Sequence, residues 1–471
     1  METTKEWITR AFATEGVDAL SRYIAIPALS PAFDPEWATT GAIEEAATLW
    51  RDFAEARTIP GLRTEIQRLE GRSPALVIRI PPSGAPEGAG TVLLYGHLDK
   101  QPAPTPWSEG RQPFVPSQEG DLLFGRGVVD DGYSAISALL AIEGLASSGA
   151  PYPECLIVIE ASEESGSPDL GAHMGVLRGE LDQLALVVCL DSGGMDFNRL
   201  WLTSSLRGNL VIFVDVEVLA HGMHSGEVSG VVPSSFRILR QLLERIEDAD
   251  TGHVLVEECH GVIPEARRKE AKVLASLVGD DLVAHFPTIG DLSLMATGAD
   301  AILNQTWRPA ISYTGIDGVP SLADGGNVLR AHTTLKLSLR LAPTADAETA
   351  NAAVMERLAS SPPSNATVRV WSETPAQGWN CAPYPTWLQH AIEEASLEAF
   401  GETPGWCGEG GSIPFLADLG AQFPEVPIVA TGALGPGSNP HGPDESLRIS
   451  MGSAVTVAVS SLLTSVATRE N

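Results

Sequence analysis

Acidic and histidine residues recur directly after apolar runs that are typical of buried strands. The first run, 91–95, is followed by Gly96, His97 and, two residues further on, Asp99. Residues i and i+2 of an extended chain point the same way, so His97 and Asp99 are predicted to lie together at the C-terminal end of a strand. Open α/β sheets place their ligands at that end. A carboxylate beside a histidine can orient its ring for metal binding, although a polar surface turn explains this single pattern equally well.

Four later stretches of the chain repeat the pattern. Their acidic and histidine residues are Asp130, Asp131, Glu163, Glu164, Asp191 and His441. The glycine-rich turn 125–132 carries the first two, and the others follow apolar runs that end at about residues 159, 190 and 434. Five such events indicate one site rather than unrelated turns. The pair Glu163–Glu164 taken alone would fit an exposed acidic turn better than a site.

Composition indicates a globular protein with more than one core. The chain has 471 residues, 44% of them hydrophobic, and a formal net charge of −30 from 60 acidic and 30 basic residues. This length favours two domains. The negative charge argues against nucleic acid or an anionic membrane as a partner, and it suits an enzyme that concentrates cations.

The termini and the cysteines favour a cytoplasmic location. Residues 1–10 contain no apolar core of signal-peptide length, and no run is expected to reach the roughly 18 apolar residues of a membrane span. The five cysteines are odd in number and show no C-x-x-C spacing, so they indicate neither a disulfide framework nor a thiolate zinc site. A reducing compartment fits this usage.

Alternating strand and helix patterns predict an α/β fold with a doubly wound, mixed and largely parallel sheet. Its strands are expected at 74–81, 90–95, 155–160, 184–190 and 427–434, and its helices as two within 2–56 and then at 133–147, 385–400 and from about 446.

A different pattern follows Arg207. Two strands, 209–219 and one over 335–341, have apolar residues on one face only, as expected for an antiparallel sheet covered by helices on one side. The remaining elements expected there are helices at 234–248 and 346–359 and a strand at 366–371. We therefore predict a smaller α+β domain, 207–379, inserted into a discontinuous domain of 1–206 and 380–471. The stretch 250–330 has no readable periodicity.

Taken together, the motifs resemble those of the M20 family of metallopeptidases, and within it the carnosinase-like dipeptidase branch. The motifs that carry this resemblance are Tyr-Gly-His-Leu-Asp (95–99), Gly-Arg-Gly-Val-Val-Asp-Asp-Gly (125–132), Glu-Ala-Ser-Glu-Glu-Ser-Gly-Ser (160–167), Cys-Leu-Asp-Ser (189–192), His-Ser-Gly (224–226), Gly-Gly-Ser-Ile-Pro (410–414) and the loop ending at His441. Two positions depart from the branch, which often has Arg where Gly408 stands and Thr where Asn327 stands.

The resemblance implies a catalytic domain with two divalent metal ions and a lid and dimerisation domain inserted into it. His97 and Asp191 would bind one ion, Glu164 and His441 the other, and Asp130 both. Mixed histidine and carboxylate ligands suit Zn²⁺, with Mn²⁺ or Co²⁺ as alternatives. The resemblance also implies a cis peptide bond between Asp130 and Asp131.

Further roles follow from the same resemblance. Glu163 would be the general base, because its neighbour Glu164 is used as a ligand, and Asp99 would hold the His97 ring. His224 of the partner subunit would stabilise the oxyanion, which implies a homodimer through the lid domain.

Arg340 can bind a substrate carboxylate through its forked guanidinium, although a solvated strand face would also explain an arginine there. Asn327 can add a contact. The backbone amides of Gly410, Gly411 and Ser412 can bind the same carboxylate.

The predicted activity is hydrolysis of the amide bond of dipeptides or short peptides with a free C-terminal carboxylate. Deacylation of N-acyl-amino acids is the alternative within the same chemistry. A non-catalytic binding protein on the same fold is the alternative from another class, but every expected ligand and base position is filled.

Overall fold

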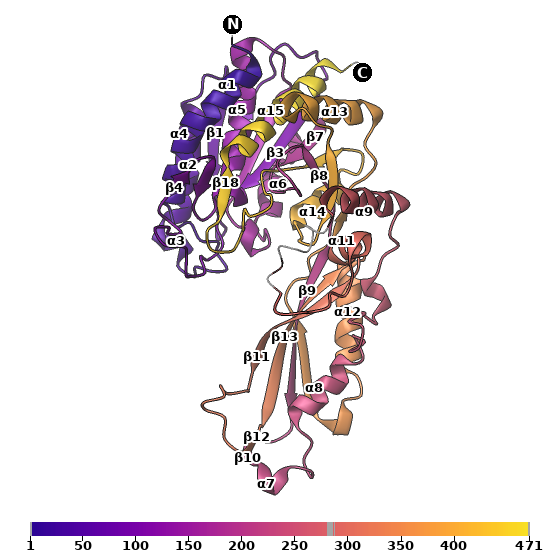
Figure 1. Ribbon diagram of the computed structural model, residues 1–471. Coiled ribbons are helices and arrows are strands. Elements are labelled where there is room, and N and C mark those ends of the chain that lie inside the picture. The colour runs from indigo at the N-terminus through magenta and orange to yellow at the C-terminus, as the bar shows by residue number, and fades with distance from the viewer. Residues whose placement is uncertain (1, 280–285, 287, 470–471) are drawn as a thin grey trace. The chain divides into compact units, whose positions relative to one another are not determined.

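The computed structural model describes residues 2–279, 286 and 288–469, which form two compact units (Figure 1). The first unit comprises Met1–Thr203, Cys381–Cys407 and Asp418–Asn471, and the second comprises Ser204–Asn380 and Gly408–Ala417. Residues 408–417 thus group with the second unit, whereas the sequence analysis places them in the first domain.

The first unit is built on a six-stranded sheet of order β1-β2-β6-β3-β7-β17. Its strands are β1 (Arg63–Gln67), β2 (Ala75–Ile80), β3 (Thr91–His97), β6 (Glu154–Glu160), β7 (Leu184–Cys189) and β17 (Ile428–Ala430). Strands β6, β3, β7 and β17 pair in parallel, whereas β2 pairs antiparallel with β1 and β6. The expectation of an α/β fold with a mixed sheet is confirmed.

The helices of this unit are α1 (Thr4–Ala11), α2 (Val17–Ile24), α3 (Trp37–Thr40), α4 (Ala42–Glu55), α5 (Tyr133–Ser148), α6 (Leu170–Leu177), α13 (Thr386–Phe400) and α15 (Ile449–Thr468). Helix α4 packs on β1 and β2, whereas α1, α5 and α13 all contact α15 or one another (Figure 1). The C-terminal region differs from expectation in two places. Strand β17 is shorter than 427–434, and Ser446–Arg448 form strand β18 before α15 begins.

Helix α15 corrects the expectation that no segment is long and apolar enough to span a membrane. Among the described residues it alone meets that test of length and composition, with 72% of its most apolar window buried inside the protein. Its neighbours are α13, α5 and α1, so its apolar surface is largely covered by the first unit. Core helices of soluble proteins pass the same test, which makes it weak evidence for a membrane span.

The second unit contains a four-stranded antiparallel sheet of order β11-β13-β9-β14. Its strands are β9 (Gly208–Glu217), β11 (Ala310–Asp317), β13 (His332–Leu341) and β14 (Thr367–Ser372). Alternate residues of β9 and β13 are buried in one core with residues of α8 (Ser235–Leu243) and α12 (Ala347–Ala359). The alternation of apolar residues in β9 and β13 therefore correctly predicts which face of each strand is buried. Strand β9 lies inside the sheet, and the edges are β11 and β14.

The remaining elements are shorter or were not readable from periodicity. They are β4 (Ser117–Glu119), β5 (Leu122–Phe124), β8 (Trp201–Leu206), β10 (Met223–His224), β12 (Val328–Leu329), β15 (Trp379–Asn380), β16 (Gly405–Glu409), α7 (Ser225–Val228), α9 (Glu265–Val278), α11 (Gly298–Thr306) and α14 (Pro414–Gln422). Three of them, α9, α11 and β12, lie in the stretch 250–330, and α9 contacts α11.

Candidate metal centre

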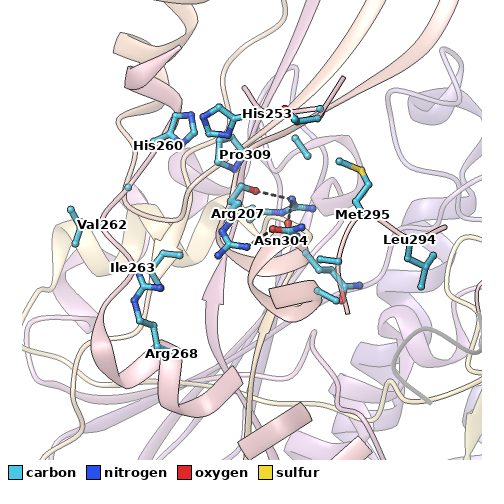
Figure 2. A pocket seen from close by; sticks show the side chains of 18 of the residues that line it. Arg207, His253, His260, Val262, Ile263, Arg268, Leu294, Met295, Asn304 and Pro309 are labelled. Carbon is cyan, nitrogen blue, oxygen red and sulfur yellow. Dashed lines mark hydrogen bonds between the residues drawn. The ribbon is translucent and has the colours of Figure 1, made fainter. Parts of the chain in front are cut away.

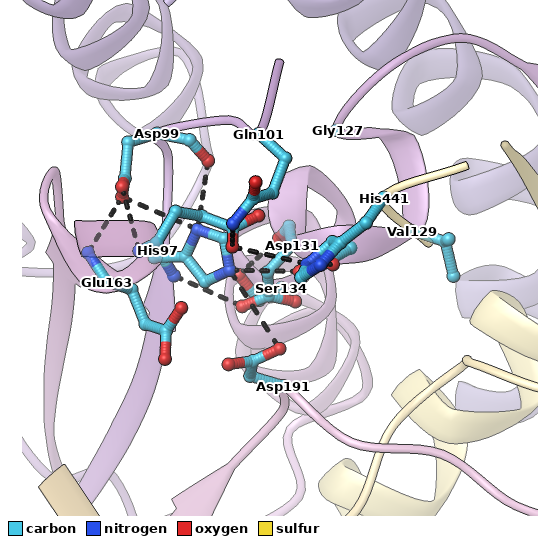
Figure 3. Close-up of polar contacts among 12 residues, drawn as sticks. His97, Asp99, Gln101, Gly127, Val129, Asp131, Ser134, Glu163, Asp191 and His441 are labelled. Carbon is cyan, nitrogen blue, oxygen red and sulfur yellow. Dashed lines mark hydrogen bonds and ion pairs between the residues drawn. The ribbon is translucent and has the colours of Figure 1, made fainter. Parts of the chain in front are cut away.

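Three neighbouring strands of the first unit end at the same place. The order β6-β3-β7 is parallel throughout, so the C-terminal ends of these strands meet at one edge of the sheet. His97 is the last residue of β3, Glu163 opens a 3₁₀ turn just after β6, and Asp191 follows the end of β7. Strand order therefore places a histidine between two acidic residues (Figure 3).

Asp130 reaches this edge from the turn Val128–Gly132, which leads into α5. This turn and the start of α5 lie very close to β3: a Cβ atom added at Gly96 would fall 2.6 Å from Oδ2 of Asp131 and 2.1 Å from Oγ of Ser134. Only glycine fits that approach. The expected cis peptide bond between Asp130 and Asp131 is present.

The predicted ligands form two groups that share Asp130. In the first group, Nε2 of His97 lies 3.2 Å from Oδ1 of Asp130 and 3.9 Å from Oδ1 of Asp191. In the second, Nε2 of His441 lies 2.9 Å from Oδ2 of Asp130 and 3.2 Å from Oε2 of Glu164. Within each group the potential ligand atoms all lie within 4.8 Å of one another.

These distances fit cation binding. Two ligand atoms held at about 2.0–2.1 Å from a tetrahedral Zn²⁺ lie about 3.3 Å apart. Three of the separations above, 2.9 to 3.2 Å, are close to this, whereas that between His97 and Asp191, 3.9 Å, is longer. Oε1 of Glu164 is also buried without a hydrogen-bond partner among the described residues. An unpaired carboxylate oxygen beside two ligand groups is suited to a metal ion.

The electrostatics of the metal-free site point the same way. Burial, together with repulsion from neighbouring acids, raises the pKa of Glu163 and of Asp191 well above their usual range, although His97 opposes it. Burial lowers the pKa of His441, but Asp130 and Glu164 outweigh it and raise that pKa to about 10. The site thus holds more negative charge than its own residues can neutralise, and divalent cations would relieve this repulsion.

The two neighbouring glutamates have different surroundings. Glu164 contacts His441 and accepts a hydrogen bond from Nε2 of Gln101 at 2.8 Å. The carboxylate of Glu163 has no hydrogen-bond partner among the described residues, and Figure 3 shows it beside His97 and Asp191. Of the two glutamates, Glu163 is therefore the one whose carboxylate is uncommitted among the described residues. Gln101 was not predicted, because an isolated glutamine after a strand carries no pattern.

Asp99 is fully buried and contacts both sides of the site. Nδ1 of His97 lies 3.0 Å from the backbone carbonyl oxygen of Asp99 and 3.5 Å from its Oδ1. The carboxylate accepts hydrogen bonds from the backbone amides of Glu163 and Glu164, both at 3.1 Å. The ring contact is therefore made mainly by the backbone carbonyl, and the side chain also fixes the glutamate turn.

The other predicted site residues belong to the second unit. His224 is exposed at the end of β10, and Asn327 directly precedes β12. Arg340 lies on β13 opposite Asn209 and Ala310, and its guanidinium has no hydrogen-bond or ion-pair partner among the described residues. Burial lowers the pKa of Arg340.

The loop 410–412 is held by an arginine that the sequence analysis did not single out. Nε of Arg207 donates to the carbonyl oxygen of Gly410 at 3.2 Å, and Nη1 donates to the carbonyl oxygens of Asn304 and Arg308 at 3.2 and 3.3 Å. Burial, with a contribution from Arg340, lowers the pKa of Arg207 to about 10. Arg207 also lines a pocket of about 990 Å³ in this unit (Figure 2).

Comparison with known proteins decides the family. The family model described as peptidase family M20/M25/M40 matches residues 93–465, which is most of the chain. The chain belongs to this family. This M20 peptidase is therefore an enzyme, as predicted, and the non-catalytic alternative is not supported.

Curated relatives place the M20 peptidase among dipeptidases. It is 28% identical over 370 residues to a cysteinylglycine-S-conjugate dipeptidase of Corynebacterium striatum, covering 76% of this chain and 77% of the relative. It is 27% identical over 332 residues to the Cys-Gly metallodipeptidase DUG1 of Saccharomyces cerevisiae, covering 69% and 68%. The resemblance to the dipeptidase branch is confirmed.

Solved structures share the fold of the M20 peptidase. A structure of the dipeptidase Dug1p from Saccharomyces cerevisiae matches with a TM-score of 0.80 at 21% identity, covering 100% of both chains. Human carnosine dipeptidase 1 matches with a TM-score of 0.76 at 20% identity, covering 99% of both chains.

Proposed function

We propose that this M20 peptidase is a dimetal dipeptidase that hydrolyses dipeptides or short peptides with a free C-terminal carboxylate. The observation that carries the proposal is the sharing of Asp130 between two ligand groups, each completed by one histidine and one acidic residue. The names of the curated relatives support the substrate class, and one relative is named a metallodipeptidase.

In this proposal His97, Asp130 and Asp191 hold one divalent ion, and Asp130, Glu164 and His441 hold the other. Zn²⁺ is the first expectation from this ligand chemistry, and Mn²⁺ and Co²⁺ are the alternatives. When bound, two such ions supply Lewis acidity for the scissile carbonyl and acidify the attacking water.

Glu163 and Asp99 have the remaining roles near the metal ions in this proposal. Glu163 takes a proton from the attacking water and returns it to the leaving amine, a role supported by its carboxylate, which has no hydrogen-bond partner among the described residues. Burial raises the pKa of Glu163, which strengthens its carboxylate as a proton acceptor. Asp99 keeps the Glu163 turn and the His97 ring in place through the contacts described above.

The second unit supplies substrate recognition in this proposal. Arg340 binds the free carboxylate of the substrate, with Asn327 and the amides of Gly410, Gly411 and Ser412 as further donors. The lack of an acidic partner for the half-buried Arg340 among the described residues supports this role, because a desolvated cation gains most from an anionic ligand. His224 of the partner subunit stabilises the oxyanion, so that the enzyme acts as a homodimer through the second unit. We also expect the enzyme to act in the cytoplasm, with neither nucleic acid nor membrane as a partner.

A substrate panel tests the activity. The full-length chain is stripped of metal, loaded with Zn²⁺, Mn²⁺ or Co²⁺, and assayed on dipeptides including Cys-Gly, on their C-terminal amides and on N-acetyl and N-succinyl amino acids. We expect turnover of the free dipeptides and little turnover of the amides. Preferential turnover of the acyl-amino acids would favour the deacylase alternative.

Loss of the shared ligand tests the metal centre. Asp130→Ala removes the one residue common to both groups, and we expect the variant to bind fewer than two Zn²⁺ ions, measured by elemental analysis of the purified protein. Full occupancy of both groups in this variant would refute the arrangement.

A further inference from the structure

We infer that the buried ion pair between Arg126 and Glu445 is a positioning device for the metal centre. It holds the backbone that carries Asp130 and the backbone that carries His441 in one fixed arrangement. This inference rests on the proposed function, because it concerns how two of the proposed ligands are kept in place.

Glu445 acts on the turn that carries Asp130. Its Oε2 accepts a hydrogen bond from the backbone amide of Gly127 at 2.9 Å, and its Oε1 accepts from the amides of Val129 and Asp130 at 3.2 and 3.4 Å. The carbonyl oxygen of Glu445 also accepts from the amide of Gly125 at 3.0 Å. One side chain therefore fixes the backbone up to and including the shared ligand.

Arg126 joins this turn to the loop of His441. Its Nη1 lies 2.6 Å from Oε2 of Glu445, and its Nη2 donates to the carbonyl oxygen of Gly442, the residue after His441, at 2.6 Å. The two partners of the ion pair are separated by 319 positions in the sequence. The pair is thus the point where the two ligand-bearing segments are tied together.

The ion pair is almost completely inaccessible, with side-chain exposures of 1% for Arg126 and 0% for Glu445. A buried pair is not in itself good evidence for stability, because well-packed apolar residues can replace it at little cost. Lys100 does not share the role, since its ammonium donates to the carbonyl oxygens of Tyr23 and Ile26. Arg126 and Glu445, by contrast, contact the backbone at Asp130 and beside His441. Outer-shell contacts of this kind typically contribute about 10–100-fold to metal affinity.

Two variants disrupt the ion pair in different ways. Arg126→Lys keeps the charge but cannot bridge Glu445 and the Gly442 carbonyl with a fork of donors. The double variant Arg126→Met/Glu445→Leu removes both charges, so that neither is left buried alone. Zn²⁺ titration calorimetry on the full-length apoprotein gives stoichiometry and affinity, and thermal unfolding gives stability. We expect both variants to bind the second equivalent of Zn²⁺ at least about tenfold more weakly than the wild type. The double variant is also expected to unfold at a lower temperature, because the amides of Gly127, Val129 and Asp130 lose their acceptor.

Glu143 provides a matched control. It too is buried, accepts a backbone amide hydrogen bond, from Thr58 at 2.8 Å, and pairs with an arginine, Arg57, at 3.3 Å. It has no contact with any proposed ligand among the described residues. Glu143→Gln is therefore expected to lower the unfolding temperature and leave both Zn²⁺ affinities unchanged.

The outcomes distinguish this inference from the function on which it rests. Two Zn²⁺ ions in the wild type and a weakened second ion in both variants would support it. Two ions bound with wild-type affinity by both variants would overturn the positioning role alone. Failure of the wild type itself to bind two ions would overturn the metal centre and this inference with it.

Discussion

Asp99 fixes the position of Glu163 through the backbone, because Oδ1 of Asp99 accepts a hydrogen bond from the amide of Glu163 at 3.1 Å. The other oxygen of the same carboxylate accepts from the amide of Glu164, also at 3.1 Å. The proposed base and one proposed ligand are thus held by a single buried side chain, which also borders the His97 ring. Asp99 therefore positions residues that follow the neighbouring strand β6 as well as His97 of β3.

Replacement of the Asp99 carboxylate should lower the turnover rate. Asp99→Asn puts an amide NH₂ against one of two backbone N–H groups, and we expect kcat to fall about 10–100-fold, as for other outer-shell changes. Steady-state kinetics on a free dipeptide measures this. Asp169→Asn is the control, since Asp169 also accepts a backbone amide hydrogen bond, from Ser73, but makes no contact with the site residues. Equal losses in the two variants would contradict a specific role for Asp99.

Glu163→Gln should remove nearly all turnover while metal content stays near that of the wild type. The carboxylate of Glu163 has no hydrogen-bond partner among the described residues, so the change removes proton transfer without removing a ligand. Loss of a general base typically costs about 10²–10⁴-fold in rate. Turnover assays test the loss of activity, and elemental analysis of the same preparation tests the retained metal content. Retention of more than about a third of the activity would show that another group is the base.

Metal affinity should rise with pH. In the metal-free protein the pKa of His441 is raised to about 10, so this ring carries a proton at neutral pH that a metal ion must displace. Binding therefore releases protons, and protons compete better as the pH falls. Zn²⁺ titrations between about pH 6 and about pH 8, in buffers of different ionisation enthalpy, measure the affinity and count the protons. An affinity independent of pH, without proton release, would contradict the ligand role of His441.

Arg340→Met should weaken the use of substrates with a free carboxylate more than that of their C-terminal amides. Removal of a hydrogen bond between charged groups costs about 1.5–3 kcal/mol, which predicts a loss in kcat/KM of about 10–100-fold for the free acids. Arg369→Met is a control in the same sheet, because Arg369 is paired with Asp215 and Glu217. If Arg340→Met lowers kcat/KM equally for the free acids and for their amides, the substrate carboxylate is bound elsewhere.

Mixed subunits test whether His224 acts on the partner. Glu163→Gln and His224→Ala chains, each inactive alone, should regain about half the wild-type activity in a mixed dimer, because one site then carries neither change. The pairing surface cannot be the edge of β9, which lies inside its sheet, so the open edges β11 and β14 are the candidates. Subunit exchange is verified by differently tagged chains. Proven exchange without recovered activity would show that His224 does not act in trans.

The sequence alone predicted the acidic and histidine residues that the structure brings together, and the types of the main elements. Apolar runs and strand alternation reflect burial on one or both faces, and they located β3, β6, β7, β9 and β13 to within a few residues. Acidic and histidine residues after those runs are candidate site residues, because ligands bind at the C-terminal ends of the strands in open α/β sheets. Helix α9 was missed because it buries only Ala271 and Leu274 and so has no apolar stripe.

The order of the strands and the long-range contacts of the site follow from the packing of distant segments, which the sequence pattern does not record. Periodicity along a strand does not state which strand is its neighbour, so the order β6-β3-β7, which places His97 between Glu163 and Asp191, could not be read from the chain. The sequence also could not predict the contacts of Gln101, of Arg207 and of the Arg126–Glu445 pair. Each of these contacts joins residues far apart in the sequence, which leave no local pattern. Hydrophobic patterning records whether a residue is buried, whereas the partner that it meets depends on the packing of distant segments.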